Sequence, residues 1–324
     1  MSPDPRPAAA NFEERMDRSQ PSIGILTCSY RGDAEACRLL CRTIDRFAPW
    51  VEHRLIVPRK DLPLFLPLRG PRREVIAQEE LQPGWLMQMP MPPPRWRRLL
   101  HLPRREMFLS LRGLPVRGWI LQQMLKIAAV RDAAWDVVLH VDSDCVFFRE
   151  LTREHLVQDG RVRFYRSPGA ADMEPHRTWH RAAATLLGLP PQDYFGADYI
   201  DSFVVWQKTI VRGLTDRIES VSGRDWWTTL SRTLHFAEYI LYGVYADRVM
   251  TEDPGHFATA RSLGLSRWSE GFSDAAAETA FLASMGADQV ACNIQSTLGL
   301  SAADRERLLG DLIAYAAAQG EAGA

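Results

Sequence analysis

Hydrophobic residues in the first half of the chain form short continuous runs that alternate with segments of helical spacing. In the segment 34–47, for example, Cys37, Leu40, Cys41 and Ile44 recur at intervals of three and four residues. The predicted strands are 22–29, 53–57, 75–78 and 137–141, and the predicted helices are 34–47 and 118–131. Because strands that alternate with helices form parallel sheets with right-handed crossovers, we predict an α/β fold whose central, mostly parallel sheet is flanked by helices.

The second half of the chain continues with the same kinds of element. Strands are predicted at 161–165 and 196–206, and helices at 208–220, 226–246 and 301–319. Ser301 and Asp304 have the spacing of a capping box and mark the start of the last helix. Four side chains are interpreted as packing residues: His140 within the strand 137–141, Trp119 in the helix before it, and the adjacent Trp226 and Trp227, for which stacking on a sugar ring is the alternative.

Two acidic residues follow the strand 137–141, in the sequence Asp142-Ser143-Asp144. In extended backbone the side chains at i and i+2 project to the same side, so we expect Asp142 and Asp144 to present two carboxylates together. Open α/β sheets bind their ligands at the carboxyl ends of strands. Two carboxylates this close repel each other unless a proton or a cation lies between them, and oxygen ligands suit Mg²⁺ or Mn²⁺. The pair therefore predicts a divalent metal held for a phosphate-bearing ligand.

Composition narrows the class of protein further. The chain has 324 residues, 46% of them hydrophobic and 24% charged, with a net charge of −1. This balance argues against a nucleic-acid partner, because proteins that bind polyanions generally carry a strong positive charge. The five cysteines form no CxxC pair, and no signal peptide or membrane-spanning run is recognisable, so we expect a cytoplasmic protein.

The predicted organisation has one large domain between two short flanking segments. Residues 1–20 are expected to be a disordered extension, 21–300 the α/β domain, and 301–324 a C-terminal helix and tail. Within the domain, 83–113 is a proline- and arginine-rich excursion. Two interpretations of its basic part, 95–112, stay open: a solvated surface segment with a short helix, or an amphipathic segment that contacts an anionic acceptor or the inner face of a membrane. Pro103 interrupts any long helix there, which favours the first interpretation.

With these residues placed, the chain resembles a bacterial glycosyltransferase of the GT-A fold, within a little-characterised family of GT-A-like proteins. The resemblance spans about 22–246, and four pieces carry it in the expected order: ILTCSY at 25–30, GWILQQMLK at 118–126, VDSD at 141–144 and AEYILY at 237–242. It implies a Rossmann-like α/β fold and the transfer of a sugar from a nucleotide-diphosphate donor, such as a UDP- or GDP-linked sugar. The resemblance does not identify the acceptor, which could be a glycan, a lipid-linked glycan or another small molecule.

The resemblance also implies roles for individual residues. Asp144 would bind Mn²⁺ or Mg²⁺ directly, and Asp142 would reach the ribose or a metal-bound water. The nucleobase and ribose would lie against the first strand and its loop, at Thr27, Ser29, Tyr30 and Asp33. On the preceding helix, Gln123 and Lys126 would contact phosphate or ribose oxygens. The alternatives are local hydrogen bonds for Thr27 and Ser29, and a surface-seeking helix lysine for Lys126.

Two further residues are candidates for the reaction itself. Glu238 would be the general base that takes the proton of the acceptor hydroxyl in an inverting transfer, with Asp198 and Asp201 as rival acidic groups. The alternative for Glu238 is a carboxylate that the dipole of its own helix stabilises at the N-terminus. His256 would be a third metal ligand, against the alternative of a solvated loop histidine.

Two other classes of protein fit part of the same pattern. The sequence Asp142-Ser143-Asp144-Cys145-Val146 also fits the motif of haloacid-dehalogenase-type phosphohydrolases, in which Asp142 would be the nucleophile. Against this class, the motif lies far from the N-terminus and no later pair of acidic residues completes its metal site. A non-catalytic protein that binds a nucleotide or a carbohydrate is the third possibility.

Overall fold

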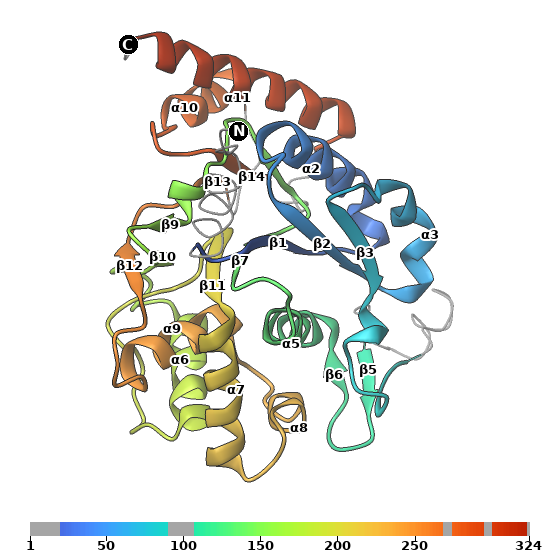
Figure 1. Cartoon of the computed structure of the whole chain (residues 1–324), viewed down its shortest axis with the longest axis vertical. Helices are drawn as coiled ribbons and strands as arrows, with labels where there is room; N and C mark the ends of the chain where they lie inside the picture. Colours follow the sequence, from blue (N-terminus) through green and yellow to red (C-terminus); the bar gives the residue numbers. More distant parts are fainter. Residues whose placement is uncertain (1–19, 90–106, 268–273, 295–299, 323–324) are drawn as a thin grey trace, which may run out of the picture.

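A five-stranded sheet forms the centre of the molecule (Figure 1). The computed structural model describes residues 20–89, 107–267, 274–294 and 300–322. Its central sheet has the strand order β11 (Phe203–Gln207), β7 (Val137–Val141), β1 (Ile23–Cys28), β2 (Glu52–Val57) and β3 (Arg73–Ala77). All neighbouring strands are parallel except β11, which runs antiparallel to β7. The prediction of a mostly parallel sheet flanked by helices is confirmed.

Helices cover both faces of the sheet because successive strand residues point to opposite sides and nearly all of them are apolar. On one side, α2 (Ala34–Phe47) packs Leu40 and Ile44 against alternate residues of β1 and β7. On the other, α5 (Gly118–Arg131) packs against the intervening residues. Figure 1 shows α2 above the sheet and α5 below it. All five residues of β7 are buried, as expected for a strand with helices on both faces.

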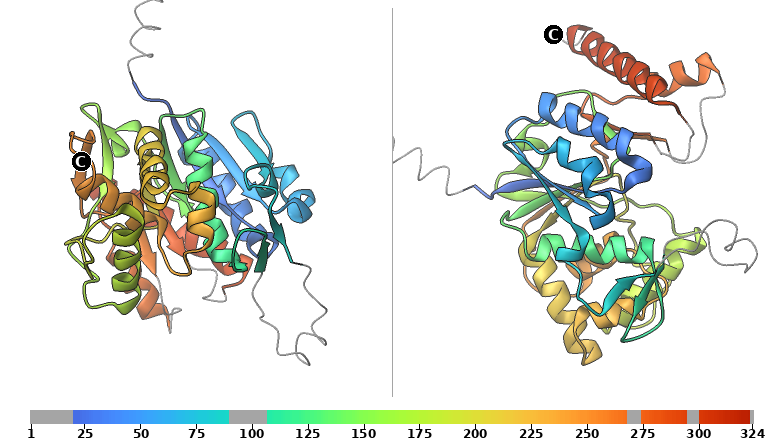
Figure 2. Two further views of the ribbon diagram at one scale, coloured as in Figure 1. Left: turned by 90° about the horizontal axis from the view of Figure 1, so that it is seen from below. Right: turned by 90° about the vertical axis from the view of Figure 1, so that its right-hand side faces the viewer.

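The remaining helices gather at the two ends of the molecule. Below the sheet, four helices share one hydrophobic core with α5: α6 (Glu174–Leu187), α7 (Lys208–Ser222), α8 (Trp226–Ser231) and α9 (Glu238–Arg248). At the opposite end lie α10 (Ala275–Ala283) and α11 (Ala302–Ala322), as the side view in Figure 2 shows. The short helix α3 (Leu62–Phe65) packs beside β3.

Three smaller sheets complete the structure. The first joins β4 (Leu86–Gln88), β5 (Met107–Ser110) and β6 (Val116–Arg117) in antiparallel fashion. The second has the order β12 (His256–Thr259), β10 (Arg161–Tyr165) and β9 (Val157–Gln158). The third has the order β13 (Gly264–Arg267), β14 (Ala291–Ile294) and β8 (Cys145–Phe147). In this sheet, β8 directly follows Asp144 in the chain.

Two predicted elements differ from the structure. The helix predicted at 226–246 is two helices, α8 and α9, because residues 232–237 leave the helical path between them. The strand predicted at 196–206 begins only at Phe203. The capping box at the start of α11 is confirmed: the N–H of Asp304 donates to Ser301 Oγ, and the N–H of Ser301 donates to the Asp304 carboxylate.

The proline- and arginine-rich excursion is only partly described. Residues 90–106, which hold most of the basic segment 95–112, lie outside the described residues, as does the predicted N-terminal extension up to residue 19. Toward the end of the excursion, Met107–Ser110 forms β5. Among the helices that the structure describes, none has the length and the apolar character needed to cross a bilayer.

Candidate functional site

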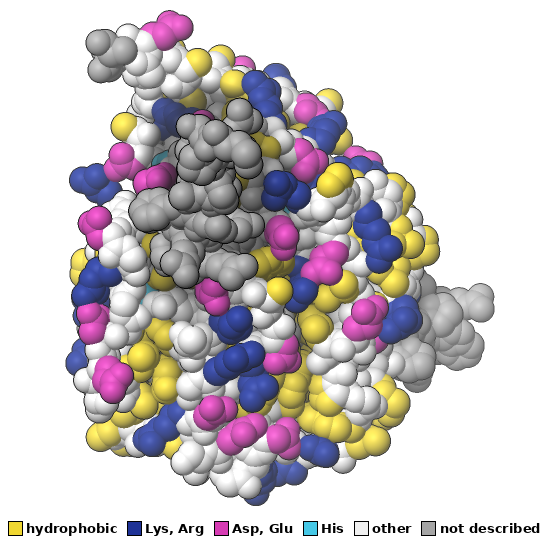
Figure 3. All heavy atoms as spheres, in the orientation of Figure 1, with side chains coloured by type: hydrophobic (Ala, Val, Ile, Leu, Met, Phe, Trp, Pro, Cys, Tyr) yellow, Lys and Arg dark blue, Asp and Glu magenta, His cyan; other side chains and the backbone are white. Residues whose placement is uncertain are grey.

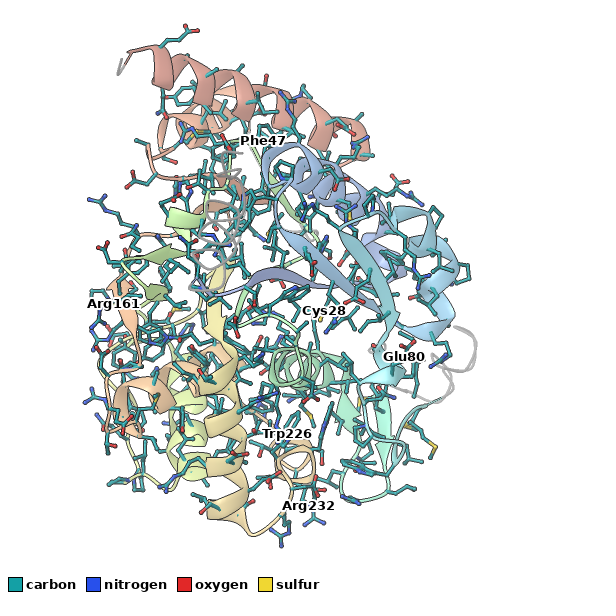
Figure 4. The ribbon with its side chains drawn as sticks, viewed as in Figure 1. Cys28, Phe47, Glu80, Arg161, Trp226 and Arg232 are labelled. Atoms are coloured by element: carbon teal, nitrogen blue, oxygen red, sulfur yellow. The ribbon has the colours of Figure 1, made fainter. Side chains whose placement is uncertain are left out.

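A cleft of about 690 Å³ lies at the edge of the central sheet where the parallel strands β1, β2, β3 and β7 end. Cys28, the last residue of β1, lies near the centre of the molecule beside α5 in Figure 4. Residues that follow the strands form one wall of the cleft, and α5, β5 and β6 form the other. The polar and aromatic side chains among the lining residues are Ser29, Tyr30, Arg31, Asp33, Gln78, Phe108, Arg117, Trp119, Gln122, Asp142, Ser143 and Asp144.

Asp142 and Asp144 both line this cleft, as the sequence predicts, but their backbone is not extended. The chain turns directly after β7, and the N–H of Cys145 donates to the carbonyl oxygen of Asp142 over 3.1 Å. The two carboxylates therefore reach the cleft because a tight turn redirects the chain from β7 into β8, and not because of strand alternation. The predicted location is right and the predicted geometry is wrong.

Each member of the turn is held by a residue from another part of the chain. Asn293, on β14, donates from its side-chain nitrogen to Asp144 Oδ1 over 3.2 Å. Ser143 donates to Asp33 Oδ2 over 3.3 Å. Burial raises the pKa of Asp33, and the nearby charge of Asp142 raises it further against the opposing effect of Ser143. The turn is thus fixed between the first helical segment after β1 and a strand close to the C-terminus.

Lys126 lies beneath the cleft floor and bridges two carboxylates. Its ammonium is 3.3 Å from Asp142 Oδ1 and 3.2 Å from Glu238 Oε1, and it donates to the Tyr239 hydroxyl over 2.8 Å. Burial alone would lower the pKa of Lys126, but the surrounding Asp142, Tyr239 and Glu238 raise it well above its usual value. Lys126 therefore stays protonated, and it is neither a surface-seeking side chain nor a residue that lines the cleft.

Glu238 is part of the same buried cluster. Its side chain is 7% exposed, and its carboxylate contacts Lys126. The N–H of Glu238 begins α9 and donates to Gln123 Oε1 over 3.1 Å. Glu238 does not line the cleft, so an acceptor that occupies the cleft would not meet this carboxylate directly. The prediction that Glu238 takes a proton from the acceptor is not supported by its position.

Of the residues predicted to hold the nucleotide, Ser29 and Tyr30 line the cleft, whereas Thr27 and Gln123 do not. Thr27 is fully buried, and its hydroxyl lies 3.0 Å from His53 Nε2. Because Arg73 donates to His53 Nδ1, the proton of this ring is on Nε2 and Thr27 accepts it. Gln123 is 2% exposed, and its amide oxygen is used by the backbone of Glu238. Both side chains serve the fold beneath the cleft.

The structure does not bring His256 to the acidic pair. The residue belongs to β12, where its ring stacks on Phe164 at 4.5 Å and its Nε2 lies 3.1 Å from the Tyr242 hydroxyl. Burial lowers the pKa of His256 to about 4. No cluster of three or more His, Cys, Asp or Glu side chains that could hold a metal ion occurs within the described ranges. The structure therefore does not bring His256 together with Asp142 and Asp144.

The rival acidic residues also lie in other surroundings. Asp201 accepts hydrogen bonds from Ser262, and burial raises its pKa to about 6. Asp198 lies 3.3 Å from His176 Nδ1. Neither residue lines the cleft. His140 is fully buried against Trp206, with the ring centroids 4.3 Å apart, as predicted for a core residue.

Sequence reasoning assigned Trp119 to the core, but its side chain is 47% exposed and lines the cleft. Trp119 is the second residue of α5, where the helix emerges from the core, and its ring lies 5.9 Å from that of Trp179. Asn293 was missed altogether, because nothing near it in the sequence relates it to Asp144. The paired Trp226 and Trp227 stack on each other at 4.6 Å, in agreement with the packing interpretation.

A second cavity, of about 420 Å³, lies at the opposite edge of the sheet, where β2 and β3 begin. Several arginines line it, among them Arg73, whose guanidinium is already bonded to Asp45, His53 and the carbonyl oxygens of Leu68 and Cys41. Ligands of open α/β sheets bind at the carboxyl ends of the strands. We therefore place the candidate site in the cleft that contains Asp142 and Asp144.

Comparison with known proteins gives one family match that extends over most of the chain. No curated protein matches the sequence. The protein family described as "Family of unknown function (DUF6492)" matches residues 22–316, a range that contains the central sheet and all the residues of the cleft. Since this match covers most of the sequence, the chain belongs to the family DUF6492.

Proposed function

We propose that this protein is a metal-dependent glycosyltransferase of GT-A-like fold, which transfers a sugar from a nucleotide-diphosphate donor. The observation that carries the proposal is the position of Asp142 and Asp144: both residues line one cleft at the carboxyl end of a central parallel strand. The cleft volume of about 690 Å³ lies within the range of roughly 300–1,000 Å³ typical of small-molecule sites.

The acidic pair fits a cation that arrives together with its substrate. Mg²⁺ and similar ions are usually bound by one or two carboxylates, with substrate phosphates and waters completing the coordination. Within the described ranges no cluster of three or more His, Cys, Asp or Glu side chains suited to a metal ion occurs, so the pair Asp142 and Asp144 matches this pattern better than a closed, all-protein metal site. When bound, such a cation neutralises the charge that develops on a leaving diphosphate.

The chain's own residues would orient the ligand around these carboxylates. Asn293 holds Asp144 by one oxygen, and Lys126 holds Asp142 from below, so both carboxylates keep their direction toward the cleft. Tyr30 and Trp119 present large, half-exposed aromatic side chains at the cleft, which suit contact with a base or a sugar ring. The lining thus combines oxygen ligands for a cation with apolar surface for a nucleotide sugar.

A thermal-shift panel tests the proposal. Nucleoside diphosphates and nucleotide sugars, each with and without Mn²⁺, are added to the wild-type protein, because a ligand that binds the folded state raises the melting temperature. We expect UDP or GDP to stabilise the protein only with Mn²⁺, and the Asp144→Asn variant to lose this response. Asp172→Asn is the matched control, since Asp172 is a fully exposed acid outside the cleft.

Two results would contradict the proposal. One is a nucleotide response that is the same with and without Mn²⁺ in both the wild type and Asp144→Asn. The other is release of phosphate from p-nitrophenyl phosphate that is lost in Asp142→Asn, which is the behaviour of a phosphohydrolase.

A further inference from the structure

The cavity where β2 and β3 begin has a lining in which positive charge is concentrated. Its charged residues are five arginines and one aspartate, whereas the whole chain has a net charge of −1. We call this space the arginine cavity, after Arg38, Arg42, Asp45, Arg69, Arg72 and Arg73. Figure 3 shows Lys and Arg side chains in dark blue, with acidic ones among them, at the upper right, where α2, β2 and β3 lie in Figure 1. A cavity lined mainly by one sign of charge concentrates ions of the opposite sign.

The buried arginine of the cavity serves the fold. Arg73 is 8% exposed, and its guanidinium lies 2.6 Å from Asp45 Oδ1. It also donates to His53 and to the carbonyl oxygens of Leu68 and Cys41. Because these contacts already use its charge and its donors, Arg73 ties β3 to α2 and is not available to a ligand. The capacity to bind an anion lies with the other four arginines, which are all exposed.

Arg69 and Arg72 lie on either side of the turn before β3. Two backbone hydrogen bonds of 3.1 Å close this turn across residues 70–73. Arg69 Nη2 donates to the carbonyl of Val75 over 3.0 Å, and Arg72 Nη1 donates to the carbonyl of Trp50 over 3.3 Å. Within the part of the chain that the structure describes, neither guanidinium forms an ion pair. Both therefore keep an uncompensated positive charge and further N–H donors for a ligand.

The helix α2 brings two more guanidiniums to the same cavity. Arg38 and Arg42 are four residues apart, so they lie on one face of the helix. Arg38 pairs with Glu35 over 3.4 Å, and Arg42 pairs with Glu306. Both members of each pair are exposed, and exposed ion pairs contribute little free energy. An anion in the cavity can therefore compete for these two arginines.

We propose that the arginine cavity binds the phosphate groups of a small molecule, at a site separate from the cleft of Asp142 and Asp144. Guanidinium groups bind phosphate through paired, charge-assisted hydrogen bonds. The oxygens of a tetrahedral phosphate point in several directions, so a ligand with two phosphates accepts from the turn before β3 and from α2 together. The volume of about 420 Å³ lies within the range of roughly 300–1,000 Å³ typical of small-molecule sites.

Isothermal titration of inorganic pyrophosphate into the full chain, in buffer that contains EDTA, tests this proposal. EDTA removes divalent cations, so the metal-dependent site proposed in the cleft does not contribute, and Asp144→Asn should bind as the wild type does. We expect saturable binding that weakens as the salt concentration rises. Arg69→Gln/Arg72→Gln should bind at least about tenfold more weakly, because two charge-assisted contacts are lost. Arg38→Gln/Arg42→Gln should weaken binding by a smaller factor, because these arginines already have carboxylate partners.

The matched control is Arg212→Gln/Arg224→Gln, which removes the same charge from two exposed positions outside the cavity. Arg212 resembles Arg69 in donating to a backbone carbonyl, and this variant should bind as the wild type does. Thermal unfolding without ligand shows whether each variant is folded. The proposal is overturned if the wild type shows no saturable binding, if citrate binds as tightly as pyrophosphate, or if Arg69→Gln/Arg72→Gln binds no more weakly than the control. Loss of binding in Asp144→Asn would also overturn it, because the pyrophosphate would then occupy the cleft.

Discussion

Replacing Lys126 by methionine should destabilise the protein strongly, because a buried carboxylate loses its cation. Methionine matches the length of the lysine side chain but carries no charge. In the structure, Lys126 Nζ lies 3.2 Å from the carboxylate of Glu238, which is 7% exposed, and 3.3 Å from Asp142, which is 38% exposed. After the substitution both carboxylates remain, and only Asp142 has appreciable access to water.

The magnitude follows from these two exposures. Removing one partner of a buried ion pair costs about 3–5 kcal/mol in the free energy of unfolding. Water screens Asp142, so we assign no cost to that residue and expect the lower end of the range, about 3 kcal/mol, from Glu238 alone. The double variant Lys126→Met/Glu238→Gln leaves no unpaired buried charge. Its stability should therefore lie within about 1 kcal/mol of the wild type.

Urea unfolding followed by circular dichroism at pH 7.5 measures these differences. The slope of the free energy against urea concentration should stay constant across the variants, which shows that the midpoints report stability. The reasoning is refuted if Lys126→Met unfolds at the same urea concentration as the wild type. It is equally refuted if the double variant is no more stable than Lys126→Met, because the unpaired charge of Glu238 would then not be the cause.

Other predictions concern the core and the cleft. Burial lowers the pKa of His180 and of His256 to about 4, so between pH 6.5 and 4 the unfolded chain binds more protons than the folded chain does, and the free energy of unfolding falls as the pH falls. Each histidine contributes up to about 1.4 kcal/mol per pH unit. Urea titrations of His256→Phe should therefore show a flatter dependence of the free energy of unfolding on pH. Gly243→Ala should destabilise the protein by about 1–3 kcal/mol in the same assay, because an added Cβ would lie 2.1 Å from the ring of Tyr199. Trp119→Ala should raise the dissociation constant of the nucleotide roughly tenfold in calorimetric titrations, with unchanged stability, because the lost side chain is a half-exposed wall of the cleft.

The elements that build the central sheet could be predicted because their signals are local. The helix 34–47 was predicted with the bounds it has, and the strand 137–141 could be identified from an unbroken apolar run. The break between α8 and α9 could not be predicted in the same way. The N–H of Glu238 starts the second helix by donating to Gln123, more than a hundred residues earlier, and no local pattern encodes that contact.

In the candidate site, too, the residues that could be predicted are those with a local sequence signal. Asp142 and Asp144 could be found because they directly follow a recognisable strand, and Ser29 and Tyr30 because they follow another. Lys126 was expected to contact phosphate or ribose oxygens, but it lies in a buried ion-pair cluster. Its partners come from the turn after β7 and from α9, so helical spacing could not predict its burial. Asn293 reaches Asp144 only through the pairing of β14 with β8, which joins segments about 150 residues apart in the chain.

His256 shows why residue type alone is a weak guide to a metal site. The preceding Asp-Pro-Gly sequence predicts an exposed loop at His256. In the structure His256 begins β12, and its ring packs between Phe164 and Tyr242. Trp119 shows the opposite error. Its place in an apolar helix suggested burial, but the first turn of α5 projects from the core into the cleft.

The proposed function requires that the turn after β7 recruits a cation for a diphosphate. Isothermal titration of UDP and GDP into the wild-type protein and into Asp144→Asn, with and without Mn²⁺, measures this directly. We expect the wild type to bind at least one of the two nucleotides tightly only in the presence of Mn²⁺, and Asp144→Asn to bind neither. Equal affinity with and without the metal, or unchanged binding by Asp144→Asn, would contradict the account.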